Sequence, residues 1–309
     1  MIRFSVQTLR SALPVLAVIL AVAPATACAQ RTDTTVAVEP TVRVQIQNFA
    51  GSVLVRTWDR AAVRVATTQR RPENVQIRGR DGVLAISTVS RTGVPAPLDY
   101  EITVPTRASL DIGGTYTAIT VEGVRGSVSA TTVQGDVALR GGDGVISLKS
   151  VEGTVTVQDA TGRIEVNGVN KGLVLRNVDG DIAAETVNGS IVLEGIQSSD
   201  VEAVTVNGGV TYDGTIRDRG RYRFGSHNGS VIVSIPERAN ATIAASTYQG
   251  TFSSRFGLPR AAEDESSGPR RRANFAFGTG SARVEAESFQ GNIILARPGD
   301  VALSRGQSR

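Results

Sequence analysis

The 309-residue sequence is poor in the side chains that carry out most enzyme chemistry. It contains one histidine (His227), one cysteine (Cys28), one methionine and one tryptophan, and aromatic residues make up only 5% of the chain. A single imidazole excludes metal sites built from several histidines. A single cysteine excludes a disulfide within the chain, so stability must come from packing and backbone hydrogen bonds.

The chain also lacks a strong excess of charge of one sign. Its 33 basic and 29 acidic residues leave a formal charge of +4, and two of the arginines, Arg3 and Arg10, lie within 1–29, a segment with no acidic residue. The remainder of the chain is therefore closer to neutral. This balance predicts no nucleic-acid partner, because phosphate binding requires a concentrated basic surface.

The N-terminal segment predicts export. A basic start precedes an apolar run over 12–23 that is too short to cross a bilayer, which is typical of a signal peptide over 1–29. Cleavage within Ala27-Cys28-Ala29 would release a soluble chain with no transmembrane span, and this is the favoured form. Cleavage before Cys28 would leave that residue for a lipid anchor, as in bacterial lipoproteins. The expected location is periplasmic, outer-membrane-associated or extracellular.

What the chain has in abundance is glycine, 33 residues of it, arranged in a repeat. The segment Val-x-Gly-x-Val recurs with its glycines in two interleaved series spaced by about eighteen residues. The first series is Gly126, Gly144, Gly162 and Gly180, and the second is Gly135, Gly153, Gly172, Gly189, Gly208, Gly229 and Gly250, with a later copy at Gly291.

After each glycine of the second series, apolar and polar residues alternate with a period of two, which is typical of strands. The repeat therefore predicts an all-β fold, a β-solenoid with two strands in each coil of about 18–21 residues. The alternative is an antiparallel meander with turns at the glycines. Two motif types that recur at every second strand favour parallel stacking.

Fixed columns of side chains accompany these glycines. A hydroxyl residue lies three positions before each one, as at Thr205 and Ser226, and an amide often lies directly before it, as at Asn188, Asn207 and Asn228. Stacked amides should form a hydrogen-bonded ladder, and the hydroxyls should satisfy backbone groups at a bend, where they would face outward.

A third column, two positions before the glycine, is apolar, and we expect it to point into the core. It contains Val133, Val187, His227, Tyr248 and Phe289. His227 is accordingly interpreted as a packed structural residue rather than a catalytic base beside Ser226 or Ser230.

The pattern also divides the chain. We expect a linker over 30–40, irregular β-coils and a cap over 41–120, a regular solenoid over 121–298 with a loop insertion at 259–272, and a flexible tail over 299–309.

The sequence resembles a bacterial family of exported β-strand-repeat proteins named as adhesin-like, a domain of unknown function. The resemblance rests on Tyr100-Glu101-Ile102-Thr103-Val104-Pro105 and on the Thr-Val-Asn-Gly copies at 186–189 and 205–208. It covers about residues 40–298. It implies the fold and a surface role, and it brings no catalytic residues.

The sequence gives weaker support to an enzymatic function. A polysaccharide hydrolase or lyase could use Asp179 and Asp181, with Asp136, Asp143 and Arg163 on other coils. The short coils and scarce aromatics count against such a site.

A calcium motif at 141–144 does not recur, and the hydroxyl column lacks the paired threonines of an ice-binding face. The sequence therefore predicts a non-enzymatic envelope or surface scaffold without a cofactor or metal. Its partner would be an envelope protein or a surface glycan, and an envelope-stress signalling accessory is a further alternative.

Overall fold

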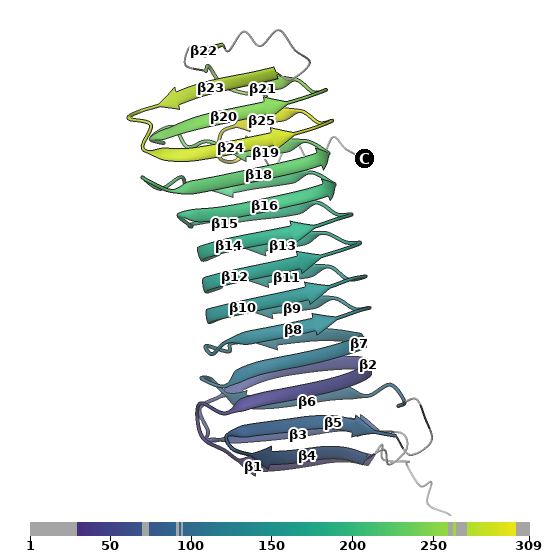
Figure 1. Ribbon diagram of the computed structural model, residues 1–309. Coiled ribbons are helices and arrows are strands. Elements are labelled where there is room, and N and C mark those ends of the chain that lie inside the picture. The colour runs from purple at the N-terminus through teal and green to yellow at the C-terminus, as the bar shows by residue number, and fades with distance from the viewer. Residues whose placement is uncertain are drawn as a thin grey trace, which may run out of the picture.

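The computed structural model describes residues 30–69, 74–90, 93, 95–258, 262–263 and 271–300. The expected signal segment with Ala27, Cys28 and Ala29, most of the 259–272 insertion and the tail from 301 lie outside these residues. The 25 elements of the described residues are all β-strands, and they stack into a rod (Figure 1). The prediction of an all-β solenoid is confirmed.

Two strands and two corners make each coil of the regular middle. Equivalent strands of successive coils pair in parallel and in register, so that Ile146 lies beside Ile164 and Ile164 beside Ile182. The antiparallel meander is therefore wrong. The strands are β8 (Val128–Thr132), β9 (Val137–Arg140), β10 (Asp143–Ser150), β11 (Val155–Gln158), β12 (Thr161–Gly168), β13 (Leu173–Arg176), β14 (Asp179–Thr186), β15 (Ile191–Ile196), β16 (Asp200–Asn207), β17 (Val210–Gly214), β18 (Arg221–Asn228) and β19 (Val231–Ser234).

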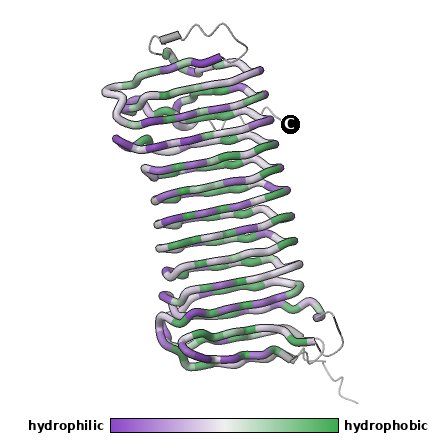
Figure 2. Tube along the Cα trace, in the orientation of Figure 1, coloured by the Kyte–Doolittle hydropathy of each residue, from purple (hydrophilic) through white to green (hydrophobic). Residues whose placement is uncertain are grey.

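The core lies between the two strand faces and runs along the rod. Buried residues alternate with more exposed ones along the strands of the middle coils. Figure 2 shows the accompanying alternation of apolar and polar residues along the trace. Ile146 and Leu148 of β10 and Val155 and Val157 of β11 are all fully buried. A coil is only one strand thick along the rod, so these side chains pack against the opposite strand of their own coil and against the two neighbouring coils.

The N-terminal end departs from this order. The long strand β2 lies between β7 on one side and the pair β5 and β6 on the other, and all of these pairings are parallel. Strand β3 pairs antiparallel with β1 and β6, and β4 pairs antiparallel with β5. These strands are β1 (Gln30–Ala37), β2 (Arg43–Trp58), β3 (Ala62–Gln69), β4 (Asn74–Arg80), β5 (Val83–Val89), β6 (Asp99–Pro105) and β7 (Ser109–Glu122).

The C-terminal end shows a similar reversal. The late strands β24 and β25 stack on β18 and β19, and the earlier β20 and β21 lie outside them. Strand β23 then pairs antiparallel with β20. It begins at Arg271, so the expected loop insertion over 259–272 ends in a strand. These strands are β20 (Ala241–Thr247), β21 (Phe252–Ser254), β22 (Ala262–Glu263), β23 (Arg271–Phe277), β24 (Ala282–Ser288) and β25 (Ile293–Ala296).

Candidate functional site

The hydroxyl column turns inward at the corner that follows each longer strand. Thr205 is 2% exposed, and its hydroxyl donates to the carbonyl of Gly189 in the preceding coil at 2.8 Å. Ser226 donates to the carbonyl of Gly208 at 2.7 Å. The same bond to the preceding coil's corner is made by Thr132, Ser150, Thr186 and Thr247, and by Ser288. The prediction that this column faces outward is wrong, because its hydroxyls satisfy corner carbonyls from inside.

The apolar column beside it turns outward. Val187 and Val206 are each 42% exposed, Phe289 is 38% exposed, and His227 is also exposed. The prediction that this column packs in the core is wrong. Alternation continues from the strand into the corner, so a buried hydroxyl residue forces its successor to the surface.

Corner glycines are required by the stacking itself. A Cβ on Gly208 would lie 2.1 Å from the carbonyl oxygen of Gly189, and one on Gly229 would lie equally close to that of Gly208. Both distances are far inside van der Waals contact. The same clash with backbone of the neighbouring coil occurs at Gly126, Gly135, Gly153, Gly180, Gly189, Gly250 and Gly291. Gly144 is different, because the nearest backbone atoms are 4.0 Å away and its φ is +154°.

The amides form a ladder along this corner. Asn228 donates to Asn207 at 2.7 Å, Asn207 to Asn188 at 2.7 Å, and Asn188 to Asn170 at 3.0 Å. Asn170 in turn donates to Glu152. The sequence pattern missed Asn170, because Lys171 takes the place of the corner glycine there and the nearby Gly172 lies one position later in the register.

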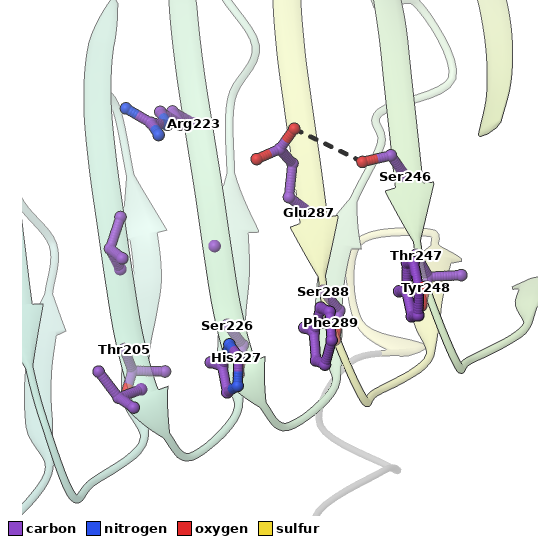
Figure 3. Close-up of a pocket in the computed structure, with 13 residues that line it drawn as sticks. Thr205, Arg223, Ser226, His227, Ser246, Thr247, Tyr248, Glu287, Ser288 and Phe289 are labelled. Atoms are coloured by element: carbon purple, nitrogen blue, oxygen red, sulfur yellow. Dashed lines mark hydrogen bonds between the residues drawn. The ribbon is translucent and has the colours of Figure 1, made fainter. Parts of the chain in front are cut away.

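A groove opens on the outer face beside the corner, across β16, β18, β24 and β20 (Figure 3). Its volume is about 550 Å³, which is within the range of small-ligand sites. It exists because Gly225 has no side chain at the outward position between Val204 and Glu287. A Cβ there would meet only the methyl groups of Val204, at 3.6 Å. The floor is thus backbone, with an apolar wall beside it.

Charged and aromatic side chains border this groove. The guanidinium of Arg223 lies on one side, where it pairs with Glu202 at 3.2 Å. On the corner side three rings stack along the rod: His227 on Phe289 at 4.7 Å between centroids, and Phe289 on Tyr248 at 4.9 Å, with interplanar angles of 4° and 9°. The groove therefore offers a cation, ring edges and an apolar wall.

A carboxylate completes the border. Glu287 lies beside Gly225 and accepts a long hydrogen bond of 3.5 Å from Ser246 (Figure 3). Carboxylate and guanidinium groups on the two sides of the groove can hydrogen-bond the hydroxyls of a ligand whose C–H surface packs against the apolar wall of Val204. Sequence reasoning missed this groove, because the absence of a side chain at Gly225 is visible only once the strands are in register.

The serine–histidine arrangement considered from the sequence is not assembled at His227. The Ser226 hydroxyl is directed into the core, where it bonds to Gly208, whereas His227 lies on the surface. The hydroxyl of Ser230 accepts a hydrogen bond from the backbone of Asn292. Both serines thus serve contacts between coils.

The candidate carboxylates are dispersed. Asp181 and Arg163 occupy neighbouring positions of one column and line a second outer groove of about 340 Å³. Asp179 instead pairs with Arg217 at 3.2 Å. Asp136 accepts a hydrogen bond from the backbone of Thr154 in the next coil.

Asp143, the acidic residue of the 141–144 segment, accepts a 3.4 Å hydrogen bond from the hydroxyl of Thr161. Within the part of the chain that the structure describes, no group of three or more histidine, cysteine, aspartate or glutamate residues is placed to hold a metal ion.

Comparison with known proteins gives the class of this chain. The sequence model of the family Toastrack DUF4097 matches residues 30–296, so the chain belongs to that family. Family membership agrees with the adhesin-like resemblance seen in the sequence. A search of curated proteins finds no match.

Three solved structures illustrate the similarity. A "putative adhesin" from Bacteroides fragilis NCTC 9343 is 12% identical, with a TM-score of 0.39 over 86% of this chain and 97% of that one. Another from Parabacteroides merdae ATCC 43184 is 8% identical, with a TM-score of 0.39 over 86% and 96% of the two chains. A "putative cell adhesion protein" from Clostridium sporogenes ATCC 15579 is 9% identical, with a TM-score of 0.23 over 87% and 100%. Membership of the family rests on the sequence model rather than on these structures.

Among the described residues, the structure contains no helix with the length and apolar character needed to cross a membrane.

Proposed function

We propose that the chain is an exported, non-enzymatic scaffold of the cell envelope or surface, and that it binds a glycan through the groove at Gly225. The observation that carries the proposal is the groove, where Arg223 and Glu287 flank a backbone floor with an apolar wall at Val204. A pyranose ring has one C–H surface and a rim of hydroxyls, which matches this combination of groups. A protein loop is the second kind of partner that such a border could accept.

Export is part of the same proposal. The apolar run over 12–23 and the small residues Ala27 and Ala29 support a signal peptide, and Cys28 supports a lipid anchor as the alternative. The intact mass of the protein recovered from soluble and membrane fractions tests this. A start at Gln30 supports the soluble form, an acylated Cys28 supports the anchored form, and a retained N-terminus contradicts export.

The groove is tested by filling it. In Gly225→Val the side chain would occupy the hollow, and the change suits a strand because valine has high β propensity. On an array of bacterial surface glycans we expect at least a tenfold loss of binding relative to the unaltered chain. Asn167→Val is the matched control, because it lies in the same outward column three coils away.

Two outcomes contradict the proposal. Binding that survives Gly225→Val places the partner elsewhere, and a chain that retains no glycan on any array has another class of partner. Turnover of a polysaccharide that is lost in Asp179→Asn with Asp181→Asn would instead support the enzyme alternative.

A further inference from the structure

The corner of the rod carries a line of exposed, mostly apolar side chains, which we name the corner stripe. It runs along one edge for eight successive coils, and its seven apolar members are 37 to 46% exposed. In spatial order its members are Val133, Val151, Val169, Val187, Val206, His227, Phe289 and Tyr248. Single exposed apolar residues are common on proteins, but a row of seven along one edge marks an interaction surface.

Two columns flank the corner stripe. On one side lies the amide column, in which Glu152 is the charged residue. On the other side lies the outward column of the longer strands, which we name the strand column. In spatial order it contains Thr131, Lys149, Asn167, Glu185, Val204, Gly225, Glu287 and Ser246. Few charges therefore oppose close approach of another apolar surface along this edge.

We propose that the partner of the corner stripe is a second copy of this chain, packed antiparallel across a two-fold axis. In that symmetry the stripe of one copy lies on the stripe of the other, and like columns face each other. A parallel arrangement would instead place the strand column against the amide column. The proposal is independent of glycan binding.

In one antiparallel alignment of the two copies, each large side chain of the corner stripe faces a small one of the other copy. When Val187 lies opposite Val206 of the second copy, Val169 lies opposite His227, Val151 opposite Phe289, and Val133 opposite Tyr248. Each of the three rings at one end of the corner stripe then meets a valine at the other end of the second copy's stripe. The pattern follows from the order of the corner stripe alone, with equal coil spacing on both copies.

The same alignment also places opposite charges face to face. Lys149 comes opposite Glu287 in the strand columns, and like charges do not face each other among the residues of the two flanking columns. In the amide columns Glu152 meets Gln290, and asparagines meet asparagines. Moving the axis to Val187 would instead place Glu185 opposite its own copy, which is unfavourable.

The size of this surface sets the strength of association. Eight coils at about 4.8 Å per coil give a line about 35 Å long, and a corner about 10 Å wide buries a few hundred Å² on each copy. Stable interfaces bury about 800 Å² on each partner, so we expect a weak dimer with a Kd of micromolar order or weaker. In this register the partner's Asn167 lies over Gly225, so a glycan and a second copy exclude each other.

Exchange of the two charges tests the register. Sedimentation equilibrium of the full chain over a wide concentration range should show a monomer–dimer equilibrium. Lys149→Glu and Glu287→Lys should each weaken it about tenfold, because each places like charges in contact. The double variant should restore it to within about threefold.

Two further variants serve as controls, one expected to keep the dimer and one expected to lose it. Arg125→Glu lies on the opposite corner and should leave the dimer unchanged, and Val187→Asp at the centre should abolish it. Thermal unfolding of every variant identifies any that fail to fold. A wild-type chain that stays monomeric at several hundred micromolar overturns the proposal, as does a double variant that remains monomeric while folded. At protein concentrations far below the dimer Kd, glycan binding by Lys149→Glu should equal that of the unaltered chain, which separates this result from the fate of the groove.

Discussion

The middle of the rod uses its strands to extend a parallel stack, whereas the ends use theirs to cover the outermost coils. In the middle, from β8 to β19, each coil follows its predecessor in chain order and every pairing is parallel. At both ends the spatial order departs from chain order, and antiparallel strands cover the outermost coil. A parallel stack offers unpaired backbone groups at each end, and these edges invite association with other strands. The antiparallel strands replace part of that edge.

The middle and the ends should therefore respond differently to a destabilising substitution. In a stack that contacts only nearest neighbours, damage to a middle coil interrupts a continuous core. Damage at an end should release only the outermost strands. The following changes separate these two regimes.

The largest effect is expected at a corner glycine of the middle. In Gly208→Val the new Cβ would fall 2.1 Å from the carbonyl oxygen of Gly189, so the backbone of two coils must shift. We expect a loss of about 3 kcal/mol or more in the free energy of unfolding, measured by urea denaturation. Gly225→Ala is the control, since its Cβ meets nothing closer than 3.6 Å. Equal losses in the two variants would contradict the role of stacking.

At the C-terminal end, Phe275→Ala should produce a local effect. Phe275 of β23 is 6% exposed and lies opposite Ile243 of β20. Its truncation should cost about 3 kcal/mol, and most of that loss should appear as faster hydrogen exchange in β20 and β23. Exchange in β10 to β15 should remain unchanged. Acceleration along the whole rod would show that the ends and the middle unfold as one unit.

A smaller effect is expected from the buried hydroxyls. Thr205→Val keeps the shape of the side chain and removes the donor to the carbonyl of Gly189. The carbonyl is left without this bond in a buried corner, so about 1 to 2 kcal/mol of unfolding free energy should be lost. Thr211→Val, at an outward position of β17, should change stability by no more than about 0.5 kcal/mol. A Thr205→Val variant as stable as wild type would contradict the assigned role of this column.

The smallest effect is confined to alkaline pH and comes from two buried tyrosines, Tyr212 and Tyr222. Burial raises the pKa of Tyr212 well above its usual range, and it also raises the pKa of Tyr222. The unfolded chain releases these protons near pH 10, whereas the folded chain retains them to higher pH. This contribution to stability is thus complete below about pH 10 and is lost as the pH rises toward the folded-state values.

Alkaline titration followed by circular dichroism should therefore show unfolding above pH 10. Tyr212→Phe should shift the transition to higher pH, although it removes the hydrogen bond from Tyr212 to the carbonyl of Thr215. A transition that is unaltered by this substitution would assign alkaline sensitivity to other groups.

The sequence predicts the strands and the stacking well, and it predicts the corner poorly. Period-two alternation and the glycine series led to the parallel coils, because both follow directly from local geometry. The orientation at the corner was wrong because hydrophobicity alone assigned Val187 to the core. In the structure Thr186 takes the inward position, since its hydroxyl satisfies a corner carbonyl that valine would leave unpaired.

The ends and the groove were not predictable from the sequence, because both depend on pairings between strands that are distant in the chain. The insertion of β24 between β18 and β20 is a long-range choice with no signal in the local pattern. The groove depends on Gly225 lying between Val204 and Glu287, residues from strands that are distant in sequence. Positive φ angles at Asp159 and Asn177, 55° and 53°, likewise had no glycine to predict them, although both residues lie three positions before a glycine of the first series.

The direction of the side chains at the corner decides whether the corner stripe and the buried hydroxyl bonds exist. Thiol labelling tests this in a chain with Cys28→Ser, because that chain then has no other cysteine. Val187→Cys should react with a soluble thiol reagent at nearly the rate of an unfolded peptide, whereas Thr186→Cys should be protected until the protein is unfolded. Protection of Val187→Cys with rapid labelling of Thr186→Cys would reverse the corner. It would remove both the corner stripe and the hydroxyl-to-carbonyl bonds on which the account rests.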